Sequence, residues 1–204
     1  MNQSVLARMA LSAALLMLAA CSGFRSKDAV VQTYVLRGAL KAPVSAAPLT
    51  PVTEQVPTLA VSRPTAASGL DSENIAAIRA DGRFDYYSAS RWAGNLPDVM
   101  QTLLVESLRS SGRYRAVLAD TSAFSADRLL QVEIRQFQSE YGGDGAPIIH
   151  LVLVGTMGSR AQREILNVVQ AESRVPASTD RMSAVVAAFN TAVAEVLSQL
   201  QAGL

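Results

Sequence analysis

The sequence predicts a single α/β domain of the α+β type, in which a mixed, largely antiparallel sheet is packed by two principal helices. Three observations carry this prediction. Two segments have apolar residues at helical spacing, several others are alternating or rich in β-branched residues, and their order is strands, helix, strands, helix. The domain is expected to cover residues 30–204, with no internal repeat.

The first strands are expected on either side of a proline-rich loop. Residues 30–36 (VVQTYVL) and 58–62 (TLAVS) are short runs rich in β-branched and aromatic residues. Residues 38–57 contain four prolines and show no periodicity. Because proline is excluded from helix interiors and central strands, this segment is predicted to be a Pro/Ala-rich loop.

A hairpin and a helix are expected next. Residues 75–79 and 83–87 flank Ala80-Asp81-Gly82, which is typical of a β-hairpin turn. Residues 90–95 are expected to connect this hairpin to a helix with Pro97 as its first residue. Gly112 is expected to end the helix. Its apolar stripe consists of Leu96, Val99, Met100, Leu103, Leu104 and Leu108.

Four more strands are expected in the second half. Residues 114–118 form a short one, and residues 128–140 alternate until Phe137 breaks the phase, which predicts a β-bulge. Residues 148–154 (IIHLVLV) are apolar on both faces, which predicts a central strand covered on both sides. Residues 163–174 complete the set.

The last helix has the clearest periodicity of the chain. Ser178, Thr179 or Asp180 is expected to cap its N-terminus. Its apolar residues recur every 3.6 positions, and packing on the sheet is favoured over contact with a membrane or a partner. The stripe consists of Met182, Val185, Val186, Phe189, Val193, Val196, Leu197 and Leu200.

The N-terminus predicts a lipid anchor. Arg8 precedes an apolar run that ends at Ala20 and is too short to span a bilayer. Leu18-Ala19-Ala20-Cys21 matches a lipobox, the signature of a bacterial lipoprotein signal peptide. Residues 1–20 are therefore expected to be removed and Cys21 to be lipidated. The alternative is an ordinary secretory signal with an incidental cysteine.

The residues after the lipobox predict where the anchor lies. Residues 21–29 are short and polar, as expected of a tether. In enterobacterial sorting an Asp after the lipidated cysteine favours retention in the inner membrane. Ser22 therefore favours the outer membrane, with the domain facing the periplasm.

Charge and cysteine content exclude several classes of function. The signal peptide contains Arg8 and no acid, so its removal lowers Lys plus Arg from 18 to 17, against 17 Asp plus Glu. A formally neutral body argues against nucleic-acid binding. Cys21 is the only cysteine, and its acylation leaves no thiol for a disulfide, a zinc site or a nucleophile. No cofactor and no metal site are expected.

The sequence offers little catalytic chemistry. The single histidine, His150, lies within the most apolar predicted strand, where a hydrogen-bonded core histidine is favoured over a general base. Ser88 or Ser90 with His150 and an Asp can be drawn as a triad, but no G-x-S-x-G motif surrounds either serine. The chain is therefore not expected to be an enzyme.

A cluster of aromatic and basic residues follows the predicted hairpin turn. Tyr86, Tyr87, Arg91 and Trp92 lie close together in a chain with only five Tyr, five Phe and one Trp. Tyr, Trp and Arg dominate the hot spots of protein interfaces. The cluster is a candidate partner-binding surface. The alternative is that these rings fill the core beneath the hairpin.

Several segments along the chain form a recognisable set, namely residues 34–36, 59–64 (LAVSRP), 69–76 (GLDSENIA), 81–108, 130–141 and 188–193 (AFNTAV). Together they resemble the ABC-type transport auxiliary lipoprotein family, which includes PqiC-type lipoproteins and lipoproteins encoded beside Mce-type lipid transporters. Ser90-Arg91-Trp92 is the most specific element of this resemblance. Ala77 departs from the family pattern, which has an aromatic residue at that position.

The resemblance implies a non-enzymatic component of an envelope-spanning lipid transport system. The expected partners are a periplasmic Mce-domain substrate-binding protein, its permease and its ATPase. A homo-oligomer of this chain is a further possibility. The protein would help to pass lipid or another hydrophobic solute between the two membranes. The alternatives are a direct periplasmic lipid carrier and, less favoured, an envelope hydrolase.

Overall fold

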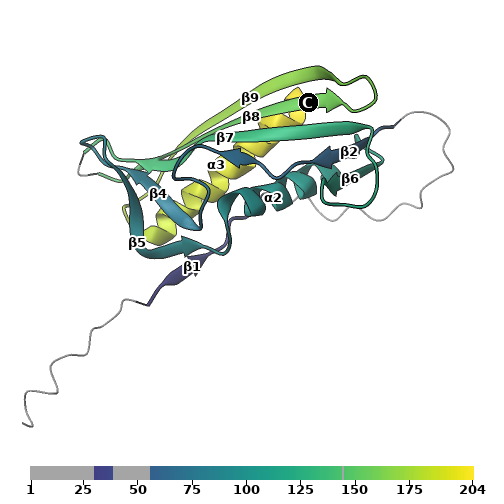
Figure 1. Ribbon diagram of the computed structural model, residues 1–204. Helices are drawn as coiled ribbons and strands as arrows, with labels where there is room; N and C mark the ends of the chain where they lie inside the picture. The colour runs from purple at the N-terminus through teal and green to yellow at the C-terminus, as the bar shows by residue number, and fades with distance from the viewer. Residues whose placement is uncertain (1–29, 39–55, 144) are drawn as a thin grey trace, which may run out of the picture. The chain divides into compact units, whose positions relative to one another are not determined.

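The structure is a computed structural model, which describes residues 30–38, 56–143 and 145–204. The expected signal peptide, Cys21, the tether and most of the Pro/Ala-rich loop lie outside these residues. The described chain confirms the predicted fold class: a mixed α/β domain whose sheet packs against two helices (Figure 1).

Five strands, a helix, four strands and a second helix follow one another in the described residues. The strands are β1 Gln32–Tyr34, β2 Thr58–Val61, β3 Thr65–Ala66, β4 Asn74–Ile78, β5 Phe84–Trp92, β6 Ala116–Ala119, β7 Arg128–Glu140, β8 Ile148–Ser159 and β9 Glu164–Pro176. The helices are α2 Leu96–Ser110 and α3 Met182–Gly203.

Strand β7 organises the sheet. One of its edges pairs along its whole length with β8, antiparallel, and β8 pairs in the same way with β9. The other edge pairs in turn with three short parallel strands: β2 near Arg128, β3 at Glu133, and β4 near Glu140. The sheet therefore divides beyond β7, with β6 beside β2 at one end and β5 and β1 beside β4 at the other.

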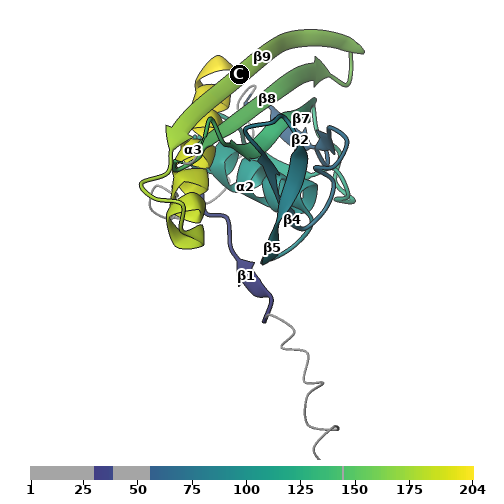
Figure 2. The same cartoon turned by 90° about the vertical axis from the view of Figure 1, so that its left-hand side faces the viewer.

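Both helices lie against the same face of the sheet, which curves around them (Figures 1 and 2). The predicted stripes are buried there, with Val99 and Met182 only partly covered. Burying one large aliphatic side chain contributes about 1.5–3 kcal/mol, so these two stripes supply much of the stabilisation. By length and mean hydropathy α3 is long and apolar enough to cross a membrane. Half of its apolar 18-residue stretch is buried inside the domain, however, as in a core helix.

Three aromatic rings meet at the centre of the core. The Trp92 ring lies edge-on to Phe137 and Phe189, with centroids 6.2 and 5.1 Å away, and Phe137 stacks on Phe189 at 5.4 Å. Each of these residues is at most 1% exposed. Edge-on and stacked pairs stabilise by about 0.5–1.5 kcal/mol beyond the burial of their area. The cluster joins β5, β7 and α3.

The expected connection at residues 90–95 is wrong in its first half. Strand β5 continues through Trp92, and Gln32 to Tyr34 of β1 pair with Ser90 to Trp92. Within β5, Ala89 has a φ of 51°, and the register against β4 shifts between Asn74 and Ala76. A bulge turns the strand here, so that its second half extends beyond the predicted hairpin.

The predicted cap of the last helix is also wrong. Arg181 occupies the N-cap position of α3, and no side chain caps the helix. Thr179 Oγ1 accepts a 3.4 Å hydrogen bond from the Arg181 amide, and the Asp180 carboxylate accepts one from Tyr141. The bulge predicted at Phe137 is present slightly earlier, where the β7–β8 register shifts between Ile134 and Gln136.

Candidate functional site: a polar groove at the hairpin end

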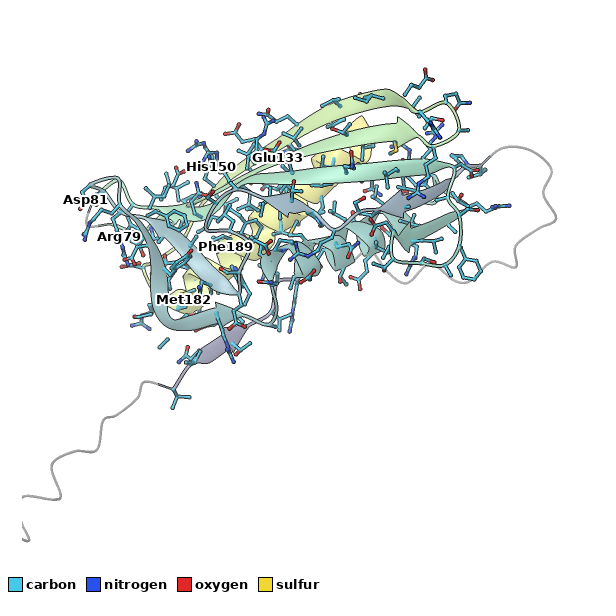
Figure 3. The ribbon with its side chains drawn as sticks, in the orientation of Figure 1. Arg79, Asp81, Glu133, His150, Met182 and Phe189 are labelled. Carbon is cyan, nitrogen blue, oxygen red and sulfur yellow. The ribbon has the colours of Figure 1, made fainter. Side chains whose placement is uncertain are left out.

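A polar groove lies at the end of the sheet where the β4–β5 hairpin turns. It consists of two adjoining hollows of about 490 and 460 Å³, which share Arg79, Tyr141 and Asp180 as lining residues. Figure 3 places Arg79 and Asp81 at this end and Met182, at the start of α3, below them. The three shared residues follow β4, follow β7 and precede α3, so the topology brings three distant segments together.

A chain of hydroxyl groups crosses the groove wall. The Tyr87 hydroxyl lies 2.9 Å from Ser139 Oγ and 2.8 Å from the Tyr141 hydroxyl, which donates to Asp180 Oδ1 at 2.6 Å. Burial, assisted by the hydrogen bonds to Asp180 and Tyr87, raises the pKa of Tyr141 far above its ordinary value. Tyr141 therefore stays protonated and gives its single proton to Asp180. It follows that Tyr87 donates to Tyr141 and accepts from Ser139.

Arg79 supplies the positive charge that the two hollows share, and Arg83 adds a second guanidinium to the first hollow. Its guanidinium forms a 3.1 Å ion pair with Asp85 and lies over the Tyr141 ring, 5.1 Å from the centroid. The hydrogen bond that the Arg79 side chain donates to Asp85 raises the pKa of Arg79. The Tyr86 amide and the Arg79 side chain hold the pKa of Asp85 below its ordinary value. Both groups therefore stay charged, and the groove presents phenols, carboxylates and two guanidinium groups, which are suited to polar ligand groups.

The structure separates the four residues of the predicted partner-binding cluster. Tyr86 and Tyr87 both line one hollow of the groove, and the Tyr86 hydroxyl donates to the Gly69 carbonyl at 2.9 Å. Arg91 is farther along β5, where it forms a 2.9 Å ion pair with Glu73. Trp92 is 1% exposed within the aromatic core. This corrects the expectation for Trp92, because a covered ring cannot contact a partner.

Sequence reasoning missed Arg79, Tyr141 and Asp180 as site residues. Arg79 was expected only as the end of a hairpin strand, and Asp180 only as a possible helix cap. Tyr141 directly follows β7 and was noted only as the last residue of the segment 130–141, without a role of its own. No spacing in the sequence links the three, so only the strand pairing that places the ends of β4 and β7 side by side reveals them.

His150 lies on β8, and its ring is held between Glu140 of β7 and Glu172 of β9. It is 7% exposed, with Nδ1 2.7 Å from Glu140 and Nε2 3.1 Å from Glu172. Arg174 forms ion pairs with both carboxylates, each at 3.2 Å. Both ring nitrogens are therefore engaged, and neither is left to activate Ser88 or Ser90. Over residues 30–38, 56–143 and 145–204, no group of three or more His, Cys, Asp or Glu side chains is arranged to hold a metal ion.

A family model described as the ABC-type transport auxiliary lipoprotein component matches residues 39–201. The chain belongs to this family. The match covers most of the domain, including α2, all but the last two residues of α3, and all the residues of the groove. No match was found among the curated proteins.

Solved structures support the fold of this auxiliary lipoprotein. Protein XCC0632 from Xanthomonas campestris, assigned to DUF330, is 24% identical with a TM-score of 0.68, over 84% of this chain and 93% of that one. A second structure, of an uncharacterised protein, is 16% identical with a TM-score of 0.60, over 84% and 98%. At these identities the likeness concerns the fold alone.

Tyr141→Phe should lower the free energy of unfolding by about 1.5–3 kcal/mol, because the hydroxyl donates to a carboxylate and accepts from Tyr87. Urea denaturation measures the change. Tyr114→Phe is the matched control, since the Tyr114 hydroxyl makes no hydrogen bond to a described residue, and it should unfold as the wild type does. Equal midpoints for all three proteins would show that the hydroxyl chain does not hold the groove together.

The Glu140–His150 contact predicts a pH dependence. Burial disfavours the ionised form of Glu140, but hydrogen bonds from His150 and Gln138 outweigh it, and the pKa of Glu140 lies below its ordinary value. A carboxyl whose pKa is lower in the folded state stabilises the fold at neutral pH, and this contribution is lost as the pH falls through the folded-state value.

Glu140→Gln should therefore be less stable than the wild type at pH 7 and should lose less stability on acidification. Denaturant midpoints at pH 7 and at a pH below the ordinary glutamate pKa measure this. Glu164→Gln is the control, because Glu164 is exposed and its side chain makes no ion pair with a described residue. A parallel loss of stability in all three proteins would contradict the prediction.

Proposed function

We propose that this lipoprotein is a docking component of an ABC-type, Mce-like transport system that moves lipid or another hydrophobic solute between the inner and outer membranes. Cys21 would be acylated and would hold the domain on the periplasmic side of the outer membrane. Its partner would be the periplasmic Mce-domain substrate-binding protein, which works with a permease and an ATPase.

The observation that carries the proposal is the character of the accessible hollows. In the described residues they are open, and most of their lining residues carry a charged or hydroxyl group, while the apolar side chains between sheet and helices are packed together. A site that carries lipid is expected to be concave and mostly apolar. Docking is therefore favoured over direct lipid carriage, which remains the second candidate function.

The hairpin end provides the proposed docking surface. Tyr86 and Tyr87 are half-buried and both line the groove, and Arg91 is exposed farther along β5. Tyr and Arg are residue types that are enriched in interface hot spots. Truncating a hot spot costs at least about 2 kcal/mol of binding free energy, which is roughly thirtyfold in affinity. The exposed Arg91–Glu73 ion pair stabilises the fold by only about 0–1 kcal/mol, so Arg91 is the cleaner probe.

Arg91→Ala and Tyr87→Ala should each weaken capture of the Mce-domain protein about thirtyfold. Arg91→Ala should do so with an almost unchanged thermal midpoint. Affinity is measured by surface plasmon resonance with the acylated protein in detergent. Arg128→Ala, at the other end of the sheet, is the control. Normal binding by both variants would exclude the hairpin end as the docking surface.

A further inference from the structure

One of the two hollows of the groove carries an unbalanced negative charge. This hollow of about 460 Å³, here called the Tyr87 hollow, is lined by three charged side chains, those of Arg79, Asp85 and Asp180. Arg79 and Asp85 neutralise each other through their 3.1 Å ion pair. Asp180 forms no ion pair with a described residue and is bonded by the Tyr141 hydroxyl alone. A ligand group with one positive charge would therefore complement the hollow.

The Asp180 carboxylate is open to such a ligand. The residue is exposed, and Oδ1 accepts the 2.6 Å hydrogen bond from Tyr141. Oδ2 accepts no hydrogen bond from a described residue. Arg181, the next residue in the chain, is exposed and is not among the residues that line the hollow. Because a carboxylate accepts through two oxygens, Asp180 is able to accept further N–H groups from outside the domain.

The rest of the lining favours a planar cation. Tyr86 and Tyr87 contribute aromatic rings, and a cation placed over the face of such a ring is stabilised. Ser88 and Ser90 contribute hydroxyl groups that bond no described residue and are able to accept from N–H donors. A guanidinium has five N–H donors in a fixed plane and stacks on aromatic faces, whereas an ammonium is a compact point charge. An arginine side chain therefore matches this lining better than a lysine.

An anionic occupant is disfavoured in the Tyr87 hollow. Its single guanidinium, that of Arg79, is already paired with Asp85. A lipid phosphate or an acidic peptide would meet the unpaired carboxylate of Asp180, and like charges in contact cost binding energy. A basic segment of a protein is thus the occupant that the charges of the hollow favour.

We infer that the Tyr87 hollow binds an arginine side chain of the periplasmic Mce-domain protein. This inference rests on the proposed function, which places that partner on the same end of the sheet. The guanidinium donates to Asp180 Oδ2 and to the Ser88 or Ser90 hydroxyl, and it lies against the Tyr87 ring. The hydrogen bond from Tyr141 positions the Asp180 carboxylate for this contact. The hollow thereby selects a basic segment of the partner.

Methionine-methyl NMR tests the hollow without the partner. Removal of residues 1–20 would leave Met100, Met157 and Met182 as the methionines of the chain. Met182 lines the hollow at the start of α3, whereas Met100 and Met157 are at most 1% exposed and serve as internal controls (Figure 3). In the acylated, methionine-methyl-labelled protein in detergent, N-acetylargininamide should shift the Met182 signal saturably. The uncharged N-acetylcitrullinamide should not.

Asp180→Asn removes the charge but keeps an oxygen that accepts from Tyr141, so its thermal midpoint should stay closer to the wild type than that of Tyr141→Phe. It should abolish the Met182 shift. It should also lower affinity for the Mce-domain protein about tenfold at low salt, because close charge pairs across an interface contribute strongly. Asp120→Asn is the matched control, since it removes an exposed carboxylate beyond β6, at the other end of the sheet, and it should behave as the wild type.

A Met182 shift that Asp180→Asn retains, or an equal shift with N-acetylcitrullinamide, would overturn this inference and leave the proposed function intact. Unchanged affinity of Asp180→Asn for the Mce-domain protein would do the same. Self-association of the wild type that Asp180→Asn abolishes would assign the arginine to a second copy, which also overturns the inference. If the wild type shows the Met182 shift but does not bind the Mce-domain protein, the proposed function fails, and the assignment of the arginine to that partner fails with it.

Discussion

Trp92→Ala should lower the free energy of unfolding by about 3–5 kcal/mol, the usual cost of truncating a buried large aromatic side chain. The ring is 1% exposed and contacts Phe137 and Phe189, so its removal leaves a cavity where β5, β7 and α3 meet. Denaturant unfolding followed by circular dichroism measures the loss. Phe189→Ala, on the opposite side of the cluster, should cost a similar amount.

Arg91→Ala is the matched control for Trp92→Ala, because it changes the neighbouring residue of the same strand and only an exposed ion pair is lost. It should shift stability by no more than about 1 kcal/mol. If Trp92→Ala unfolds at the wild-type midpoint, the ring does not support the core.

Cys21→Ser should abolish membrane anchoring. The mature body is formally neutral, and nothing in the sequence outside the signal peptide is expected to span a membrane. Acyl chains on one residue bind through about 0.8 kcal/mol per buried methylene, so their loss removes the whole attachment. The exported variant should be either soluble or unprocessed, and after salt and carbonate washes any cleaved variant should be found in the soluble fraction.

Ser22→Asp is the companion variant, since it keeps the lipidated cysteine. In an enterobacterial host it should stay in the membrane pellet but move toward the inner-membrane density. A cleaved Cys21→Ser protein that still sediments with membranes would contradict anchoring through this residue. An unchanged density for Ser22→Asp would contradict sorting by residue 22.

Elements whose pattern is local were predictable from the sequence. The alternation in residues 128–140 defines β7 with the same bounds in the structure, and the 3.6-residue stripe identifies α3. Elements that depend on a neighbour were not. β3 has two residues and exists because β7 offers a free edge at Glu133. The extension of β5 through Trp92 depends on pairing with β1 and on the bend at Ala89.

The groove was predictable only in part for the same reason. Tyr87 belongs to a visible concentration of aromatic residues, and the structure places it in the groove wall. Its partners Tyr141 and Asp180 are 54 and 93 positions away in the sequence, and a hydrogen-bond chain between such distant residues has no sequence signal. Asp180 resembled a helix cap because Asp is common at that position, but its carboxylate binds Tyr141 instead.

The most direct test of the account is the affinity of the acylated, full-length protein for the Mce-domain protein of its own transport system, measured in detergent by surface plasmon resonance. The account predicts saturable binding by the wild type that Arg91→Ala weakens about thirtyfold, while Arg128→Ala leaves it unchanged. Absence of wild-type binding, together with stoichiometric lipid extracted from the purified protein, would contradict docking and support the direct lipid carrier.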